Sequence, residues 1–184
     1  YVANIIGEEY IIPTLGVWNS FDEIDWDTLP NQFVLKTTHG GGGGGVVICK
    51  DKTTFDKEKA KQKLQNSLNS DTYINFREWP YKNVPRRIIA EKYMTDESSI
   101  ELKDYKFFCF NGKVNCFKVD FDRFIGHKAN YYNRDAELLP FGEECCMPDF
   151  NRKFEKPKNF DRMIALAEEL AQNIPFVRVD FYNS

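Results

Sequence analysis

Residues 33–49 read Phe33-Val34-Leu35-Lys36-Thr37-Thr38-His39, then six glycines from Gly40 to Gly45, then Val46-Val47-Ile48-Cys49. Two β-prone runs flank the glycines, and Lys36 stands just before them. Glycine has no Cβ and reaches positive φ easily, so its backbone can approach a ligand closely. A loop between paired strands can turn its N–H groups towards an anion, and a lysine adds positive charge beside them. The pattern predicts a hairpin loop that closes over nucleotide phosphates.

A flexible linker is the alternative explanation for the glycine run. Linkers usually mix in serine or other polar residues and join charged or proline-rich segments. This run joins two apolar segments directly, which favours the phosphate loop.

The better-known phosphate motifs do not fit this loop. No Gly-Lys-Ser/Thr closes it, so a Walker A loop is excluded. A dinucleotide fingerprint needs a helix after the glycines, whereas β-prone residues follow here. Protein kinases place their lysine after the glycine loop and carry His-Arg-Asp and Asp-Phe-Gly motifs, which this chain lacks. The order of strand, lysine, glycine loop and strand that remains is that of ATP-grasp enzymes.

Length and composition indicate a soluble globular protein. The 184 residues are 42% hydrophobic and 29% charged, enough for one core or two small lobes. A net charge of −3 gives no general attraction to nucleic acid. We see no signal peptide and no apolar run of the roughly 20 residues that a membrane span needs, and expect a cytoplasmic protein. Because the chain starts at Tyr1 and stops at Ser184 after a predicted strand, we expect a piece of a longer protein.

The five cysteines are expected to be free thiols. Their number is odd and no Cys-x-x-Cys pair occurs. No zinc site is expected, because His39 and His127 are the only histidines and no ligand spacing is visible.

The pattern beyond the glycine hairpin predicts an α+β protein with more strands than helices. In the first half we expect a short helix or loop over residues 1–20, a helix over 55–68 capped by Thr54, irregular structure over 71–85 and a strand over 86–94. In the second half we expect a hairpin of strands 104–111 and 113–121, turned at Asn111-Gly112. A loop over 138–158, a helix over 159–172 and a strand over 176–182 complete the chain.

Four phrases resemble the TupA-like ATP-grasp proteins, and their order resembles the D-alanine–D-alanine ligase pattern of the wider superfamily. The phrases are Lys36-Thr37-Thr38-His39-Gly40, Glu78-Trp79-Pro80-Tyr81-Lys82-Asn83, Asp104-Tyr105-Lys106-Phe107-Phe108-Cys109-Phe110-Asn111-Gly112-Lys113 and Val177-Arg178-Val179-Asp180-Phe181-Tyr182. The resemblance covers nearly the whole chain. It implies an α+β fold in which two lobes with mainly antiparallel sheets grip a nucleotide. Residues 1–30 would end an upstream region, 31–94 would form the small lobe, and 95–184 the large lobe, truncated before its last strands.

The resemblance also implies nucleotide-binding roles. Lys36 would contact the ATP phosphates, which a set of glycines would cover with backbone N–H groups. Glu91 would accept from the adenine amino group, with Lys92 and Met94 offering backbone atoms to the adenine edge. The phosphate-covering glycines are Gly41, Gly42, Gly43 and Gly44.

The later strands are implied to carry the ribose, the reacting phosphoryl group and the metal. Asp104 would hold the ribose, although it lies farther from Glu91 than in relatives, and Lys106 would reach phosphate. Arg178 would meet the transferring phosphoryl group, and Asp180 would bind Mg²⁺, which prefers hard carboxylate oxygens.

Each of these assignments has a structural alternative. Arg178 and Asp180 alternate along a strand and would otherwise form a solvated face. Glu91 and Lys92 would be surface charges at a strand end, and Lys106 an exposed strand lysine. His39 is expected to anchor the loop by a hydrogen bond. Arg123, Lys128 and Arg134 occupy the stretch that carries an acceptor-site loop in relatives.

The implied activity is an ATP- and Mg²⁺-dependent carboxylate–amine (or similar nucleophile) ligase that works through an acyl-phosphate. TupA-like proteins accompany teichuronopeptide and capsular polysaccharide biosynthesis, which implies a small-molecule or polysaccharide acceptor. A glycosyltransferase and a non-catalytic nucleotide-binding module are the alternatives, although no nucleotide-sugar Rossmann pattern occurs. The family's second metal-binding pair, a Glu followed two residues later by Asn, would lie beyond Ser184, so we expect this piece alone to be inactive.

Overall fold

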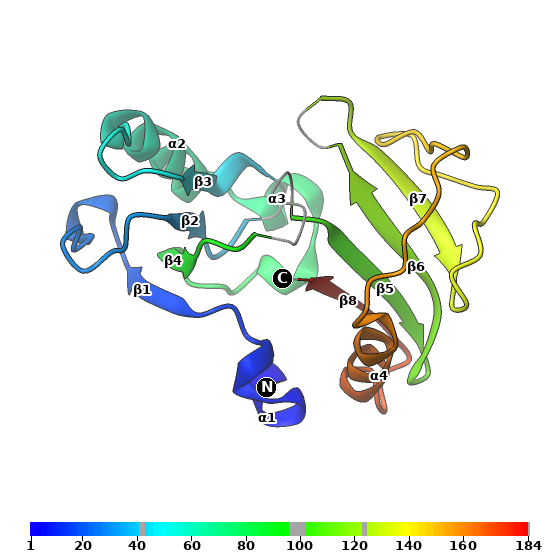
Figure 1. Ribbon diagram of the computed structural model, residues 1–184. Helices are drawn as coiled ribbons and strands as arrows, with labels where there is room; N and C mark the ends of the chain where they lie inside the picture. The colour runs from blue at the N-terminus through cyan, green and yellow to red at the C-terminus, as the bar shows by residue number, and fades with distance from the viewer. Residues whose placement is uncertain (41–42, 96–101, 123–124, 184) are drawn as a thin grey trace. The chain divides into compact units, whose positions relative to one another are not determined.

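The computed structural model describes residues 1–40, 43–95, 102–122 and 125–183, which divide into two compact units (Figure 1). One unit is Ile12–Tyr93, and the other joins Tyr1–Ile11 to Met94–Ser184. Each unit contains one four-stranded antiparallel sheet with helices, so the predicted α+β class is confirmed. Among the described helices, none is long and apolar enough to cross a membrane.

The sheet of the Ile12–Tyr93 unit carries the glycine hairpin. Its strand order is β1-β4-β2-β3, with β1 at Thr14–Trp18, β4 at Ile88–Lys92, β2 at Phe33–Thr37 and β3 at Val46–Cys49. Along β2, Phe33 and Leu35 are fully buried, whereas Val34 and Lys36 are only half-buried. This period-two alternation directs one face of the sheet to a core that helix α2 (Lys57–Asn69) helps to form.

Three predictions in this unit were wrong: the cap of α2, the structure of residues 14–18, and the irregular structure over 71–85. Helix α2 is capped by Asp56 instead of Thr54: the Asp56 carboxylate accepts from the Lys59 N–H at 2.9 Å, while the Thr54 hydroxyl donates to the Asp51 carbonyl. Strand β1 replaces the expected helix or loop, because pairing with distant β4 imposes the extended conformation. Helix α3 (Thr72–Phe76) forms within the stretch expected to be irregular, with the Asp71 carboxylate accepting from the Ile74 N–H at 2.8 Å. The unit also contains 3₁₀ turns at Phe21–Glu23, Gly43–Gly45 and Trp79–Tyr81.

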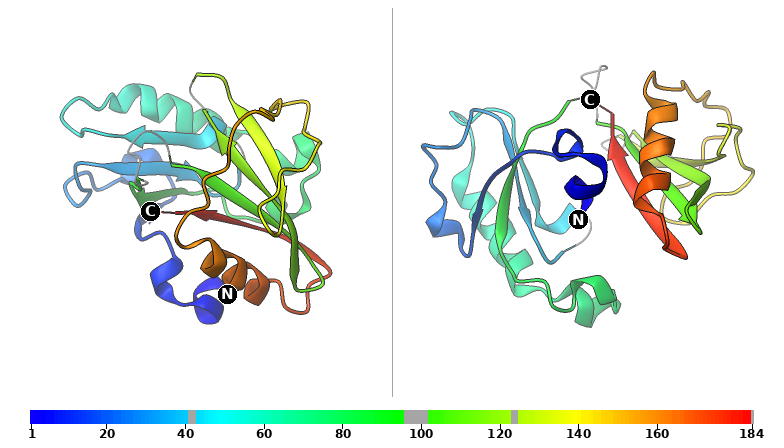
Figure 2. Two further views of the ribbon diagram at one scale, coloured as in Figure 1. Left: turned by 45° about the vertical axis from the view of Figure 1, so that its right-hand side comes forward. Right: turned by 90° about the horizontal axis from the view of Figure 1, so that it is seen from below.

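The second unit places helix α4 against one face of its sheet (Figure 2). The strand order is β7-β6-β5-β8, with β7 at Lys128–Asn133, β6 at Lys113–Phe121, β5 at Asp104–Phe110 and β8 at Phe176–Tyr182. Helix α4 covers Phe160–Leu170, close to the predicted range, and α1 (Val2–Ile6) and a 3₁₀ turn (Glu8–Tyr10) begin the chain.

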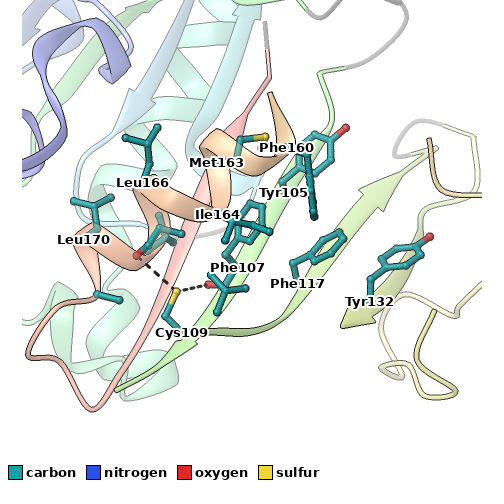
Figure 3. Close-up of a cluster of buried hydrophobic side chains, with 14 of the residues drawn as sticks. Tyr105, Phe107, Cys109, Phe117, Tyr132, Phe160, Met163, Ile164, Leu166 and Leu170 are labelled. Carbon is teal, nitrogen blue, oxygen red and sulfur yellow. Dashed lines mark hydrogen bonds between the residues drawn. The ribbon is translucent and has the colours of Figure 1, made fainter. Parts of the chain in front are cut away.

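The core beneath α4 is built from aromatic side chains of alternate strand positions (Figure 3). Phe107 and Phe117 stack at 5.4 Å between ring centroids, and Phe160 of α4 lies 5.0 Å from Phe117. Burying such aromatic groups supplies most of the stabilisation that a sheet–helix pair can gain. This arrangement reserves one face of the sheet for the core and leaves the other face for polar side chains.

The predicted hairpin turn at Asn111-Gly112 is confirmed. Asn111 has φ of 49° and Gly112 has φ of +79°, the two positive values that a type I′ turn requires. Strand β7 was not predicted, whereas residues 138–158 form loop structure as expected, with only isolated bridges.

The structure shows why glycine is needed at one position of the glycine run, Gly45. None of the described loop glycines, at 40 and 43–45, has positive φ, so their conformational freedom is not the reason. A Cβ on Gly45 would lie 2.2 Å from Thr37 Oγ1 and 2.5 Å from Ser67 Oγ, two hydroxyls that are hydrogen-bonded at 2.7 Å. Gly45 therefore permits close contact between the loop and α2.

Gly45→Ala should lower the free energy of unfolding by about 1–3 kcal/mol, the usual cost of overpacking a filled position. Gly44→Ala is the matched control, because a Cβ there meets nothing described within 4 Å. Urea denaturation followed by circular dichroism measures both. Equal midpoints for the two variants would contradict this explanation of the close contact.

Candidate functional site

The polar face of the β7-β6-β5-β8 sheet is set by strand register. In antiparallel pairs, directly opposed residues project to the same side of the sheet. Lys106 of β5 is opposed by Lys118 of β6 and by Asp180 of β8, and Asp104 is opposed by Asp120. These five charged side chains therefore share the face opposite the aromatic core.

Lys106 is the central cation of this face. Its ammonium group pairs with the Asp104 carboxylate, lies 3.1 Å from Asp120 Oδ2 and lies 4.0 Å from Asp180 Oδ2. Only 12% of the Lys106 side chain is exposed, and only 2% of that of Asp120. A cation this buried holds neighbouring carboxylates in their charged state.

Lys118 provides a second cation beside Asp120. Its ammonium lies 3.5 Å from Asp120 Oδ1 and 2.6 Å from Glu143 Oε1. Burial alone would raise the pKa of Asp120, but Lys106 and Lys118 outweigh it and hold this pKa below its usual value. Burial likewise opposes the charge on Lys118, yet Glu143 and Asp120 raise its pKa above the ordinary value.

Asp180 is the most accessible carboxylate of those around Lys106, with 36% of its side chain exposed. Arg178, two residues earlier on the same strand, donates from Nε at 2.8 Å and from Nη2 at 2.9 Å to its two oxygens. Arg178 and Asp180 lie on one face, as the alternation predicted, and the paired geometry presents a guanidinium beside a carboxylate.

In the Ile12–Tyr93 unit, Lys36 lies against Glu91. The Lys36 ammonium is 2.5 Å from Glu91 Oε2, on the face of the sheet opposite its core. The backbone N–H of Lys92 donates to the Pro13 carbonyl at 2.9 Å. The structure therefore brings Lys36 and Glu91 together where β2 pairs with β4, whereas Lys92 ends β4 opposite Phe33.

His39 anchors the glycine loop, as expected. Its Nε2 lies 3.1 Å from the carbonyl oxygens of both Ser67 and Ser70, at the end of α2, and the residue is 4% exposed. Gly43 and Gly44 are described and open on the Cβ side, whereas Gly41 and Gly42 lie outside the described residues.

Some residues of the polar face were not identified from sequence. These residues are Asp120, Lys118 and Glu143. A charge pattern in the sequence could have identified two of them, because Lys118-x-Asp120 mirrors Asp104-x-Lys106 across the hairpin. Of the residues assigned to an acceptor loop, Arg134 pairs instead with Glu168 at 3.2 Å. Lys128 begins β7, and Arg123 lies outside the described residues.

The arrangement suits phosphate and metal chemistry. Carboxylate oxygens are the ligands that Mg²⁺ prefers, and a guanidinium beside them can bind phosphoryl oxygens with two N–H groups. Two α+β units with antiparallel sheets, one of them carrying a lysine and a glycine hairpin, define the ATP-grasp class of protein.

Comparison with known proteins narrows this class. The family described as TupA-like ATPgrasp matches residues 1–184, so the chain belongs to the TupA-like ATP-grasp family. Among curated proteins, none matches the sequence significantly.

Two solved structures are similar to the chain. The ATP-grasp ligase PsnB, complexed with minimal precursor, is 9% identical with a TM-score of 0.42, over 94% of this chain and 42% of that one. The D-alanine–D-alanine ligase from Bacillus anthracis is 16% identical with a TM-score of 0.45, over 99% of this chain and 52% of that one. The chain thus spans about half the length of these solved structures.

Lys106→Met should lower the free energy of unfolding by about 3 kcal/mol near neutral pH, because it leaves buried carboxylates short of their cation. The pKa of Asp120 is depressed in the folded state, so its ion pairs stabilise the fold above its unfolded pKa, and this stabilisation is lost as the pH falls through the folded pKa. The difference between variant and wild type should therefore shrink below about pH 4.

Lys113→Met is the matched control for this measurement. Lys113 is 70% exposed and pairs with Glu168 at 3.0 Å, so its loss should cost about 0–1 kcal/mol. Denaturant titrations at several pH values compare the two variants. Equal losses of unfolding free energy in the two variants would show that the carboxylates do not depend on Lys106. A loss in Lys106→Met that does not change with pH would show the same.

Proposed function

We propose that the full-length protein is an ATP- and Mg²⁺-dependent ligase that joins a carboxylate to an amine or similar nucleophile. The reaction proceeds through an acyl-phosphate, in the biosynthesis of a cell-surface polysaccharide such as capsule or teichuronopeptide. The acceptor is a small molecule or the polysaccharide. The observation that carries this proposal is the Lys106-centred carboxylate face with Arg178 beside Asp180, in a chain of the TupA-like ATP-grasp family.

The nucleotide is assigned to residues of the glycine hairpin and its neighbours. Lys36 binds phosphate after releasing Glu91, whose carboxylate then becomes available to the adenine amino group. Because the Lys92 N–H already donates to Pro13, its carbonyl is the backbone atom assigned to the adenine edge, with Met94 beside it. Gly41 to Gly44 cover the phosphates with N–H groups, and the open Cβ sides of Gly43 and Gly44 support this role.

We assign Mg²⁺ to Asp180, the ribose to Asp104 and phosphate to Lys106. The donor chemistry fits, because Asp180 offers two hard oxygens at a half-exposed position, whereas Asp104 and Asp120 are buried. When bound, the ion neutralises the charge on the phosphate oxygens that are being transferred.

The chain's own cations complete the chemistry. Arg178 donates two N–H groups to Asp180 and can redirect them to the equatorial oxygens of the phosphoryl group. Lys106 helps to hold the pKa of Asp120 below its usual value, so this buried carboxylate is charged at neutral pH. Holding the phosphoryl group and the metal ion in fixed positions supplies orientation as well as charge. These two contributions are most of what phosphoryl transfer requires.

We also propose a cytoplasmic location. All five cysteines are free in the structure, which suits the reducing compartment where ATP is plentiful.

The full-length protein should bind ATP with Mg²⁺ and not nucleotide sugars. The carboxylate face matches a metal-bound triphosphate, and the glycosyltransferase alternative predicts the reverse preference. Isothermal titration with ATP·Mg²⁺, ATP with chelator and several nucleotide sugars separates them. Heat from a nucleotide sugar alone, with none from ATP·Mg²⁺, would overturn the ligase proposal.

Asp180→Asn should reduce turnover by roughly 100-fold or more, as removal of one group that stabilises transition-state charge does. It should also weaken the Mg²⁺-dependent part of ATP binding, because an amide lacks the charge of the carboxylate. Asp161→Asn is the control: Asp161 is 86% exposed and pairs only with Lys156 among its described ion-pair partners, at 2.9 Å. Unchanged turnover in Asp180→Asn would show that the metal lies elsewhere.

A further inference from the structure

A cluster of nitrogen, sulfur and oxygen ligands lies beside the Lys106-centred face. His127 Nε2 is 2.9 Å from Asp120 Oδ1 and 3.7 Å from Cys146 Sγ, and His127 Nδ1 is 3.2 Å from the same sulfur. One ligand atom from each of these three residues lies within 4.8 Å of the other two. This cluster was not predicted from the sequence, because the three residues are separated and share no regular spacing.

Three separate segments bring the ligands together. Asp120 lies near the end of β6, and His127 immediately precedes β7. In Figure 1 the segment after β7 returns towards the end of the sheet where β6 ends and β7 begins. This segment contains the turn Glu143–Cys146, in which the Cys146 N–H donates to the Glu143 carbonyl at 3.4 Å. This turn also places Cys145, and Glu143, Cys145 and Cys146 form a second group of ligand atoms within 4.8 Å.

We propose that Asp120, His127, Cys145 and Cys146 bind one Zn²⁺ ion. The donors are two thiolates, one imidazole nitrogen and one carboxylate oxygen, a combination that suits zinc and disfavours Mg²⁺. No zinc site was expected from the sequence, because there are two histidines and no ligand spacing, but spacing does not detect ligands that a sheet and a distant turn bring together.

The geometry fits a tetrahedral ion. Zinc bonds of about 2.3 Å to sulfur and 2.0–2.1 Å to nitrogen or oxygen separate ligand atoms by roughly 3.3–3.7 Å. The distance of 3.7 Å between His127 Nε2 and Cys146 Sγ has this length. The shorter Asp120–His127 pair opens by a small rotation of the imidazole, whose side chain is 36% exposed. Cys145 is exposed and its ligand atom lies within 4.8 Å of that of Cys146, so its thiol completes the set by rotating about χ1.

The local charge also fits a divalent cation. Two thiolates and the carboxylates of Asp120 and Glu143 carry four negative charges when metal is bound. The ion and the ammonium groups of Lys106 and Lys118 carry four positive ones, and both lysines already lie within 3.5 Å of Asp120. Glu143 stays on Lys118, at 2.6 Å, and acts as an outer partner of the site.

A catalytic cysteine is the competing use of the same residues. The order Cys146, His127, Asp120 is the hydrogen-bond order of a thiol nucleophile with its base and orienting carboxylate. However, Cys146 is only 7% exposed. Reactive cysteines are accessible and have a lowered pKa, so the cluster is better suited to hold a metal.

The full-length protein, purified without chelators, should contain one zinc ion per chain by elemental analysis. After chelation, Co²⁺ should restore a site with a thiolate-to-cobalt charge-transfer band in the near-ultraviolet spectrum. Mg²⁺ in large excess should not displace either ion. Absence of stoichiometric zinc together with absence of the charge-transfer band would overturn the proposal.

Variants identify the ligands in a Zn²⁺ competition titration against a chromogenic chelator. Cys146→Ser and His127→Gln should each weaken Zn²⁺ binding by roughly 100-fold or more, since even outer-shell partners cost about 10–100-fold. His127 is exposed, so its variant remains informative if Cys146→Ser fails to fold. Cys116→Ser, a cysteine outside both ligand groups, is the control and should bind Zn²⁺ normally. Unchanged affinity in both ligand variants would refute the site, and unchanged affinity in Cys145→Ser would refute the four-ligand set.

Discussion

The pairing register of β5 with β6 and β8 is the constraint on which the polar face depends. Because opposed residues share a side of the sheet, this register places Lys106 against Lys118 and Asp180 and turns Phe107 towards α4. A slip of one residue would move Lys106 into the aromatic core and Phe107 onto the polar face. The cost of burying an ammonium without its carboxylates therefore fixes the same register that the aromatic core requires.

The two faces of this sheet contribute to the stability of the fold in different ways. The aromatic core beneath α4 supplies the free energy of burial, while the ion pairs around Lys106 add little net stability because their desolvation is costly. Their value lies in specificity: one buried lysine shared by several carboxylates holds these groups close together, which their mutual repulsion would otherwise oppose. Such a face is prepared for cations before any ligand binds.

The sequence predicted the elements whose signals are local. Asn111-Gly112 specifies its turn through positive φ, the apolar spacing of α4 lies within one helix, and the phrases of β2, β5 and β8 carry the family resemblance. Strands β1 and β7 were missed, because their extended conformation depends on partners elsewhere in the sheet. Glu143 was missed for the same reason, since its cation Lys118 lies 25 residues away in the chain.

The polar face also changes in chemical character from one edge to the other. Towards β8 its ligands are the carboxylate oxygens of Asp104 and Asp180, which suit a hard, hydrated ion, whereas towards β7 they are the imidazole and thiols around Cys146. Asp120 lies between them, 3.1 Å from Lys106 and 2.9 Å from His127. An ion at the proposed zinc site would neutralise part of the negative charge of Asp120 and leave Lys106 more strongly attracted to Asp104 and Asp180. Under that proposal, Asp120 would couple the two edges of the face electrostatically, because it is the one carboxylate that contacts both Lys106 and His127 among the described residues.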